Sequence, residues 1–142
     1  MSHRLRIGVL GTGHLGRIHL RCLQSLAAQW ELVGFFDPNQ EARKAVEDLA
    51  LEEEWHMSPT AFESADSLFA AVDAIAIVTP TEDHARMAEA ALHAGCHVFI
   101  EKPVTTTLAE SERLIQARDA VGKVVQVGHV ERFNPAFQAA QH

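Results

Sequence analysis

Short apolar runs alternate with amphipathic stretches along most of the chain, a pattern typical of repeated βαβ units. The apolar runs predict six strands, at Leu5–Leu10, Leu32–Phe36, Trp55–Met57, Ala74–Val78, His97–Ile100 and Val124–Val127. The intervening stretches predict five helices, at His14–Ala28, Asn39–Ala50, Thr60–Val72, Thr81–Ala94 and Leu108–Val121. The alternation therefore predicts an α/β fold with a doubly wound, six-stranded parallel sheet.

Composition narrows the class of protein further. The 142 residues suffice for about one domain, and twelve Lys and Arg against nineteen Asp and Glu give a net charge of −7. Nucleic-acid affinity depends on neutralising phosphates, so we expect no nucleic-acid partner. No apolar run reaches the roughly 18 residues that span a bilayer, so we expect no membrane partner. The two cysteines, Cys22 and Cys96, require no oxidising compartment, and we expect a cytoplasmic location.

A glycine motif joins the first predicted strand to the first helix. Its six residues are Gly11, Thr12, Gly13, His14, Leu15 and Gly16. The spacing G-x-G-x-x-G supplies a tight turn, close backbone approach to a pyrophosphate, and close packing of helix on strand. The N-terminus of the helix adds free N–H groups and a partial positive charge for the anion. We therefore assign this loop to cofactor binding in a Rossmann-type domain.

Asp37 ends the second predicted strand, 21 residues after Gly16. An acid at about this offset hydrogen-bonds the ribose hydroxyls of a bound dinucleotide. Its charge would repel the 2′-phosphate of NADP, so we expect NAD as the cofactor and disfavour NADP. Arg43 lies one helical turn further along and is expected to be solvated. The alternative for Asp37 is a purely structural cap of the following helix.

Further polar motifs follow the fourth and fifth predicted strands, where parallel sheets bind ligands. They are Thr79-Pro80-Thr81 with His84, Gly95-Cys96-His97-Val98, and Glu101-Lys102-Pro103. With the glycine loop and Asp37, these motifs resemble the glucose–fructose oxidoreductase/inositol dehydrogenase (Gfo/Idh/MocA) family over essentially the whole chain. The Glu-Lys-Pro triplet is the most specific local mark of the resemblance.

The resemblance implies roles for individual residues. Thr79 and Pro80 would line the cofactor, with Thr81 and His84 beside them and Glu101 as a cofactor-side neighbour. For His84, a local capping role is the alternative. Lys102 would reach the junction of nicotinamide and substrate and act as the catalytic residue. The implied activity is an NAD-dependent oxidation of a CH–OH group, in which the lysine assists the proton transfer that accompanies hydride loss.

The segment Gly128-His129-Val130-Glu131-Arg132-Phe133-Asn134-Pro135 is similar to family members that oxidise the 3-hydroxyl of UDP-N-acetylglucosamine. It implies a sugar or nucleotide-sugar substrate, with His129 and Arg132 joining Lys102 as substrate-side residues. The planar guanidinium of Arg132 is suited to a diphosphate, and a salt bridge at a domain hinge is the alternative.

Family members continue into a second α/β domain, which binds substrate and usually forms the oligomer interface. We therefore interpret residues 1–128 as the dinucleotide-binding domain and residues 129–142 as the start of the crossover to that domain. This sequence stops at His142, so we expect it to be a fragment of an enzyme or a protein reduced to its cofactor module. By itself it should bind NAD without turnover. We also expect a homo-oligomer.

Two other function classes remain as alternatives. One is an NAD-sensing or interaction module without catalysis. The other is an S-adenosylmethionine-dependent methyltransferase, against which Gly16 and the triplet at Glu101 both argue. The nine histidines are scattered, and Gly95 breaks the helix that would align His93 with His97, so we expect no metal.

Overall fold

The computed structural model describes residues 4–141. The strands are β1 (Leu5–Leu10), β2 (Trp30–Phe36), β3 (Thr60–Ala61), β4 (Ala74–Ile77), β5 (His97–Ile100) and β6 (Val125–Val127). The helices are α1 (His14–Ser25), α2 (Gln40–Glu52), α3 (Ala65–Ala71), α4 (Thr81–His93), α5 (Leu108–Val121), the 3₁₀ helix η1 (Val130–Phe133) and α6 (Pro135–Ala140).

The six strands form one parallel sheet in the order β3-β2-β1-β4-β5-β6. This arrangement confirms the predicted doubly wound Rossmann fold. The strand order changes direction between β1 and β4, which is where such sheets bind ligands, outside the carboxyl ends of the strands. The glycine loop, Asp37, the Thr-Pro turn and the Lys-Pro turn follow β1, β2, β4 and β5, so all four lie along this one edge.

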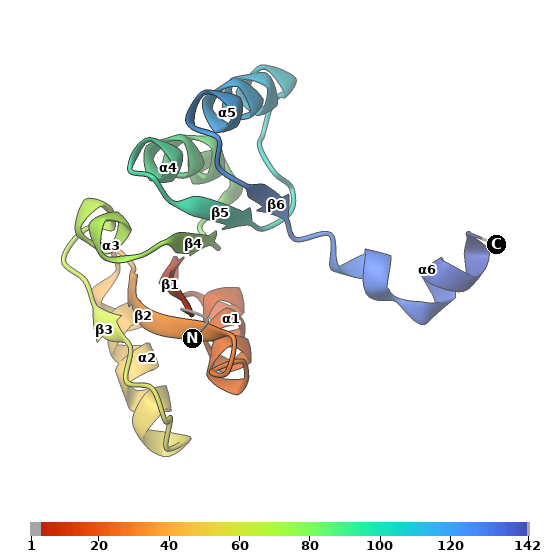
Figure 1. Cartoon of the computed structure of the whole chain (residues 1–142). Coiled ribbons are helices and arrows are strands. Elements are labelled where there is room, and N and C mark those ends of the chain that lie inside the picture. Colours follow the sequence, from red (N-terminus) through yellow and green to blue (C-terminus); the bar gives the residue numbers. More distant parts are fainter. Residues whose placement is uncertain (1–3, 142) are drawn as a thin grey trace.

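Helices cover both faces of the sheet (Figure 1). On one face, α3, α4 and α5 pack on side chains such as Ile75 and Ile77 of β4. On the other face, α1 and α2 pack on the remaining side chains of the same strand, Ala74 and Ala76. The alternation follows from the two-residue period of a strand. Because both faces are covered, β4 is continuously apolar and all four of its residues are buried.

The third strand and third helix differ from the prediction. The strand is Thr60–Ala61, which pairs with Gly34 and Phe35 of β2, and Trp55–Met57 lies outside the sheet. The N–H of Trp55 donates to the carbonyl of Ala50, so this segment closes the end of α2. A strand of two residues has too little periodic pattern to be recognised from sequence.

The helix predicted over Thr60–Val72 begins only at Ala65, because Ser64 is its N-cap. The Ser64 hydroxyl oxygen accepts from the N–H of Ser67, and the Ser67 hydroxyl oxygen accepts from the N–H of Ser64. This reciprocal pairing is a capping box, which satisfies two otherwise free backbone donors at a helix start.

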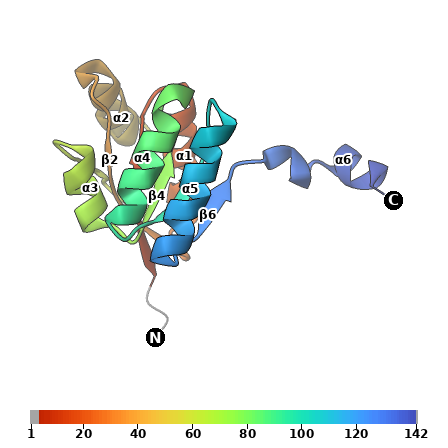
Figure 2. The ribbon, with the colours of Figure 1, turned by 90° about the horizontal axis from the view of Figure 1, so that it is seen from above.

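The segment after β6 leaves the body of the domain (Figures 1 and 2). We call residues 129–141 the C-terminal arm; it contains η1 and α6, and every one of its residues is exposed. Phe133 is 79% exposed and Phe137 is 47% exposed. Within residues 4–141, no helix is long and apolar enough to cross a membrane.

Candidate cofactor site

A cavity of about 770 Å³ lies along the carboxyl edge of the sheet. It is lined by residues that the sequence predicted for cofactor binding, namely Gly11, Gly13, His14, Leu15, Asp37, Thr79 and Pro80. These residues come from three separate loops, after β1, β2 and β4. The fold therefore gathers the predicted glycine loop, acid and Thr-Pro turn around one space.

The three glycines of the loop have different surroundings. Gly11 has a φ of +90°, and a Cβ on it would lie 2.8 Å from the backbone of Val78 and Thr79. A Cβ on Gly16 would lie 2.1 Å from the carbonyl oxygen of Gly11. A Cβ on Gly13 would meet nothing within 4 Å. Gly11 and Gly16 are thus required by packing, whereas Gly13 leaves open space beside the cavity.

Gly13 is also the N-cap of α1, and no side chain hydrogen-bonds to this end of the helix. The first turn holds no acidic residue. Uncapped N–H groups and the positive end of the helix dipole therefore face the open space above Gly13. This arrangement fits an anionic group such as the pyrophosphate of a dinucleotide.

Asp37 ties the end of β2 to the glycine loop. Its Oδ2 accepts from the backbone N–H of Thr12 at 2.7 Å and from the Thr12 hydroxyl at 3.2 Å, and its Oδ1 accepts from the N–H of Asn39 at 2.8 Å. Asn39, not Asp37, is the N-cap of α2. A carboxylate has about four acceptor positions, so three donors leave room for a ribose hydroxyl.

Thr79 contributes a second feature that fits a ligand. Its hydroxyl oxygen is buried and has no hydrogen-bond partner among the described residues. Buried polar atoms are nearly always paired in native proteins, so an unpaired one beside a cavity is a candidate for a ligand contact. Thr81, predicted next to it, is the first residue of α4.

His84 does not line the cavity. It is 1% exposed, and its two ring nitrogens contact the backbone carbonyl oxygens of Thr79 and Pro103, each at 2.9 Å. The structure therefore places His84 between the turns after β4 and β5.

The three residues predicted for the substrate side line a second cavity, of about 450 Å³. They are Lys102, His129 and Arg132, and part of the C-terminal arm completes the wall. Lys102 is exposed, and its peptide bond to Pro103 is cis. The turn after β5 and the beginning of the arm thus present a lysine, a histidine and an arginine to the same space.

Glu101 is buried directly before this turn. Its Oε2 accepts from the N–H of Lys102 at 3.1 Å, and its Oε1 lies 2.8 Å from Nε2 of His19 on α1. The His19 ring also packs against Phe99, with 5.5 Å between the ring centroids. Sequence reasoning missed His19, because nothing in the local pattern links positions 82 residues apart.

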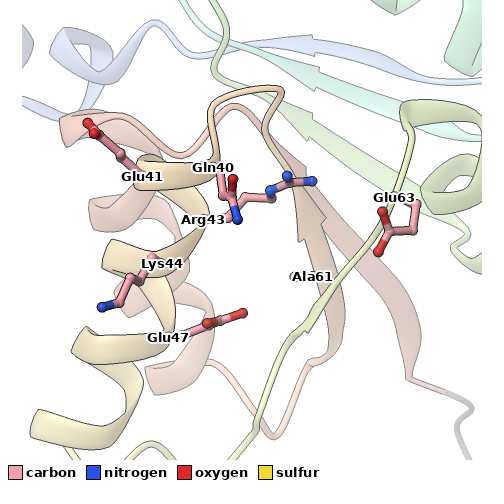
Figure 3. A pocket seen from close by; sticks show the side chains of 7 residues that line it. All are labelled: Gln40, Glu41, Arg43, Lys44, Glu47, Ala61 and Glu63. Carbon is pink, nitrogen blue, oxygen red and sulfur yellow. The ribbon is translucent and has the colours of Figure 1, made fainter.

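A third cavity, of about 590 Å³, lies between α2 and β3 (Figure 3). Arg43 and Glu47 point into it from α2 and Glu63 faces them, whereas Lys44 points away. Arg43 does not line the cavity that contains Asp37. The charges around this third space are of both signs, so it does not select an anionic ligand.

No group of three or more His, Cys, Asp or Glu within residues 4–141 is arranged to hold a metal ion. Over the same range, Cys22 and Cys96 are both free thiols.

A parallel sheet in the order β3-β2-β1-β4-β5-β6, a glycine loop with an open helix N-terminus, and an acid after β2 define a dinucleotide-binding Rossmann domain. Residues 5–129 match the family model GFO_IDH_MocA, described as an oxidoreductase family with an NAD-binding Rossmann fold. The chain belongs to this family. The match confirms the predicted family and NAD as its cofactor.

Curated relatives share the match over nearly the whole chain. A UDP-N-acetylglucosamine 3-dehydrogenase from Acidithiobacillus ferrooxidans is 43% identical over 134 residues, which is 94% of this chain and 40% of that protein. A scyllo-inositol 2-dehydrogenase (NAD(+)) from Bacillus subtilis is 34% identical over 142 residues, covering 99% of this chain and 40% of that protein. The chain thus spans about 40% of the length of these relatives.

Solved structures agree. The solved structure of the Acidithiobacillus ferrooxidans UDP-N-acetylglucosamine 3-dehydrogenase matches this chain with a TM-score of 0.83 and 38% identity, and the match covers 99% of this chain and 43% of that chain. A scyllo-inositol dehydrogenase from Lactobacillus casei with bound NAD(H) and scyllo-inositol has a TM-score of 0.82 at 27% identity, with coverage of 98% and 40%.

Proposed function

We propose that this chain is the NAD-binding part of a dehydrogenase that oxidises a hydroxyl group of a sugar, cyclitol or nucleotide sugar. The observation that carries the proposal is the cavity that joins the glycine loop, Asp37 and the Thr-Pro turn at one edge of the sheet. The relatives named above, which act on UDP-N-acetylglucosamine and on an inositol, support the substrate class.

The order of the strands supports an orientation for the two halves of the cofactor. Asp37 follows β2, on one side of the glycine loop, and its free acceptor position suits the adenosine ribose. The nicotinamide half then lies on the other side of the loop, over β4 and β5. Thr79 and Lys102 follow those two strands and stand on the nicotinamide side in this proposal.

Lys102 is the residue that we assign to catalysis. A bound NAD would supply the acceptor for the hydride that leaves the substrate carbon, and the substrate hydroxyl would have to lose a proton at the same time. The exposed Lys102 amine, in its neutral form, accepts that proton, and it shares its cavity with His129 and Arg132. The buried Glu101 holds the Lys102 backbone through the hydrogen bond to its N–H.

Within this class we favour a nucleotide sugar such as UDP-N-acetylglucosamine. The cavity beside Lys102 carries the Arg132 guanidinium, whose paired donors match a diphosphate oxygen pair. The 43% identity to a UDP-N-acetylglucosamine 3-dehydrogenase, against 34% to a scyllo-inositol 2-dehydrogenase, points the same way.

A chimera tests this function. Residues 1–128 of this chain replace the matching segment of the Acidithiobacillus ferrooxidans relative, and NADH formation is followed with UDP-N-acetylglucosamine and with scyllo-inositol. We expect NAD-dependent turnover, faster with the UDP-sugar. Lys102→Ala should lower kcat by about 100-fold or more with the KM for NAD unchanged. Lys44→Ala, on exposed α2 surface, is the matched control and should leave both constants unchanged.

NAD binding without turnover in this chimera would contradict the catalytic assignment and favour the alternative of an NAD-sensing module. Turnover that survives Lys102→Ala would contradict only the catalytic role of Lys102 and would leave the rest of the proposal standing. Failure of the chain to bind NAD would contradict the proposed function as a whole.

A further inference from the structure

The His84 side chain joins two turns that are far apart in the sequence. Its Nδ1 lies 2.9 Å from the carbonyl oxygen of Pro103, and its Nε2 lies 2.9 Å from the carbonyl oxygen of Thr79. The ring is 1% exposed, so water does not compete for either contact. A short, rigid side chain therefore bridges the turn after β4 and the turn after β5.

Each of these turns forms part of a different cavity. Thr79 lines the cavity that contains the glycine loop and Asp37. Lys102, which precedes Pro103, lines the cavity that also contains His129 and Arg132. The bridge through His84 thus ties a wall of the cofactor cavity to the wall that bears the proposed catalytic lysine.

The chemistry of the bridge depends on donors. Both partners are carbonyl oxygens, which only accept hydrogen bonds, so a ring nitrogen of His84 hydrogen-bonds to its partner only where it carries a proton. A neutral imidazole donates through one nitrogen, and a ring protonated at both nitrogens donates through both. An aliphatic side chain of similar size fills the same space but donates to neither carbonyl, and the two turns would then be free to move apart.

We propose that His84 is a positioning residue that holds the Thr79 and Pro103 turns together and so places Lys102 against the nicotinamide end of the cofactor cavity. This inference rests on the proposed function, because it uses the assignment of the nicotinamide half to β4 and β5. A residue that only fills the core would affect the stability of the whole domain and every ligand equally.

The test compares NAD with ADP-ribose, which lacks the nicotinamide, by calorimetric titration of the chain and four variants. His84→Ala removes both ring nitrogens and with them both contacts to the carbonyl oxygens. His84→Asn keeps a donor close to the position of Nδ1, and His84→Gln keeps one close to the position of Nε2. His93→Ala is the matched control, since His93 is an exposed histidine at the end of the same helix. Thermal unfolding is measured for each variant.

In the unmodified chain we expect tighter binding of NAD than of ADP-ribose. His84→Ala should weaken the binding of NAD by about tenfold and change the affinity for ADP-ribose by less than about twofold. His84→Asn and His84→Gln each keep a donor near one of the two carbonyl oxygens, so their NAD affinity should fall between those of the unmodified chain and His84→Ala. His93→Ala should match the unmodified chain.

Three results would overturn the inference. The first is equal affinity of the unmodified chain for NAD and ADP-ribose. The second is a parallel loss of affinity for both ligands in the His84 variants that follows their melting temperatures. The third is unchanged NAD affinity in folded His84→Ala, His84→Asn and His84→Gln. If one of them occurs while the unmodified chain binds NAD, only the role of His84 fails. If the unmodified chain binds neither ligand, the proposed function fails with it.

Discussion

Among single residues, the three glycines of the loop differ in whether the fold or the ligand requires them. Gly11 needs its positive φ, and Gly16 needs the close approach of α1 to the Gly11 carbonyl. Gly13 has a φ of −60°, which any residue adopts, and its open side borders the cavity. Of the three, Gly13 is therefore the position where binding can be altered without altering the fold.

Gly13→Ala should leave thermal stability nearly unchanged, because the added methyl meets no atom of the chain. The substitution should weaken NAD binding by about tenfold or more, since the methyl group occupies space needed by the pyrophosphate. Gly16→Ala should instead destabilise the domain by about 1–3 kcal/mol. Thermal unfolding and NAD titration of both variants check this. An intact NAD affinity in folded Gly13→Ala would contradict the position assigned to the pyrophosphate.

Residue-scale chemistry was predictable where it is local and not where it depends on tertiary contact. The glycine loop and Asp37 belong to one βαβ unit of the sequence, and both line the same cavity, as the sequence predicts. The pairing of His19 with Glu101 joins α1 to the end of β5 and carries no local signal. The sequence also left two roles open for His84, and its burial between two carbonyl groups is visible only in the fold.

At the scale of elements, capping residues decide where helices begin. Thr107 caps α5, its hydroxyl accepts from the N–H of Glu110, and the Glu110 carboxylate accepts from the N–H groups of Thr106 and Thr107. The predicted start at Leu108 agrees with the structure. At α3, the apolar pattern suggested an earlier start, because the Ser64 cap was not recognised.

The capping box of α5 gives a prediction about pH. Hydrogen bonds from the Thr106 hydroxyl, and then from the Thr107 backbone, lower the pKa of Glu110 in the folded chain. A lowered folded-state pKa stabilises the domain above the ordinary carboxyl pKa, and the contribution is lost as pH falls through the folded value. Glu110→Gln should therefore reduce the melting temperature at pH 7 and have a progressively smaller effect towards pH 3.

Exposed Glu112 on the same helix provides the control. Glu112→Gln should change the melting temperature little across the same pH range. An effect of Glu110→Gln that grows as pH falls would contradict the capping role of the carboxylate.

At the scale of the whole molecule, the C-terminal arm stands apart from the sheet (Figure 2). The six strands and the helices that cover them were predictable, because their alternating pattern repeats along the chain. The direction of the arm was not, since no residue of its two short helices is buried and no apolar face of the arm fixes its position on the sheet. The arm carries the exposed Phe133 and Phe137, and it borders the cavity of Lys102.

We predict that the chain self-associates through this arm, because exposed aromatic side chains on a projecting segment gain by being buried against a second copy. Sedimentation velocity should show the apparent mass rising with concentration. Replacing Phe133 and Phe137 together by Ser should abolish that rise. Leu51→Ser, at an equally exposed leucine of α2, should not. A monomer at every concentration in the unmodified chain would contradict this prediction.

The central claim is that the carboxyl edge of this sheet binds NAD with Asp37 at the adenosine ribose. Calorimetric titration of the unmodified chain and of Asp37→Ala, each with NAD and with NADP, tests it most directly. We expect one NAD per chain, NADP about tenfold weaker or more, and a gap between the two cofactors that narrows in Asp37→Ala. Absence of NAD binding, or equal affinity of the unmodified chain for NAD and NADP, would contradict the claim.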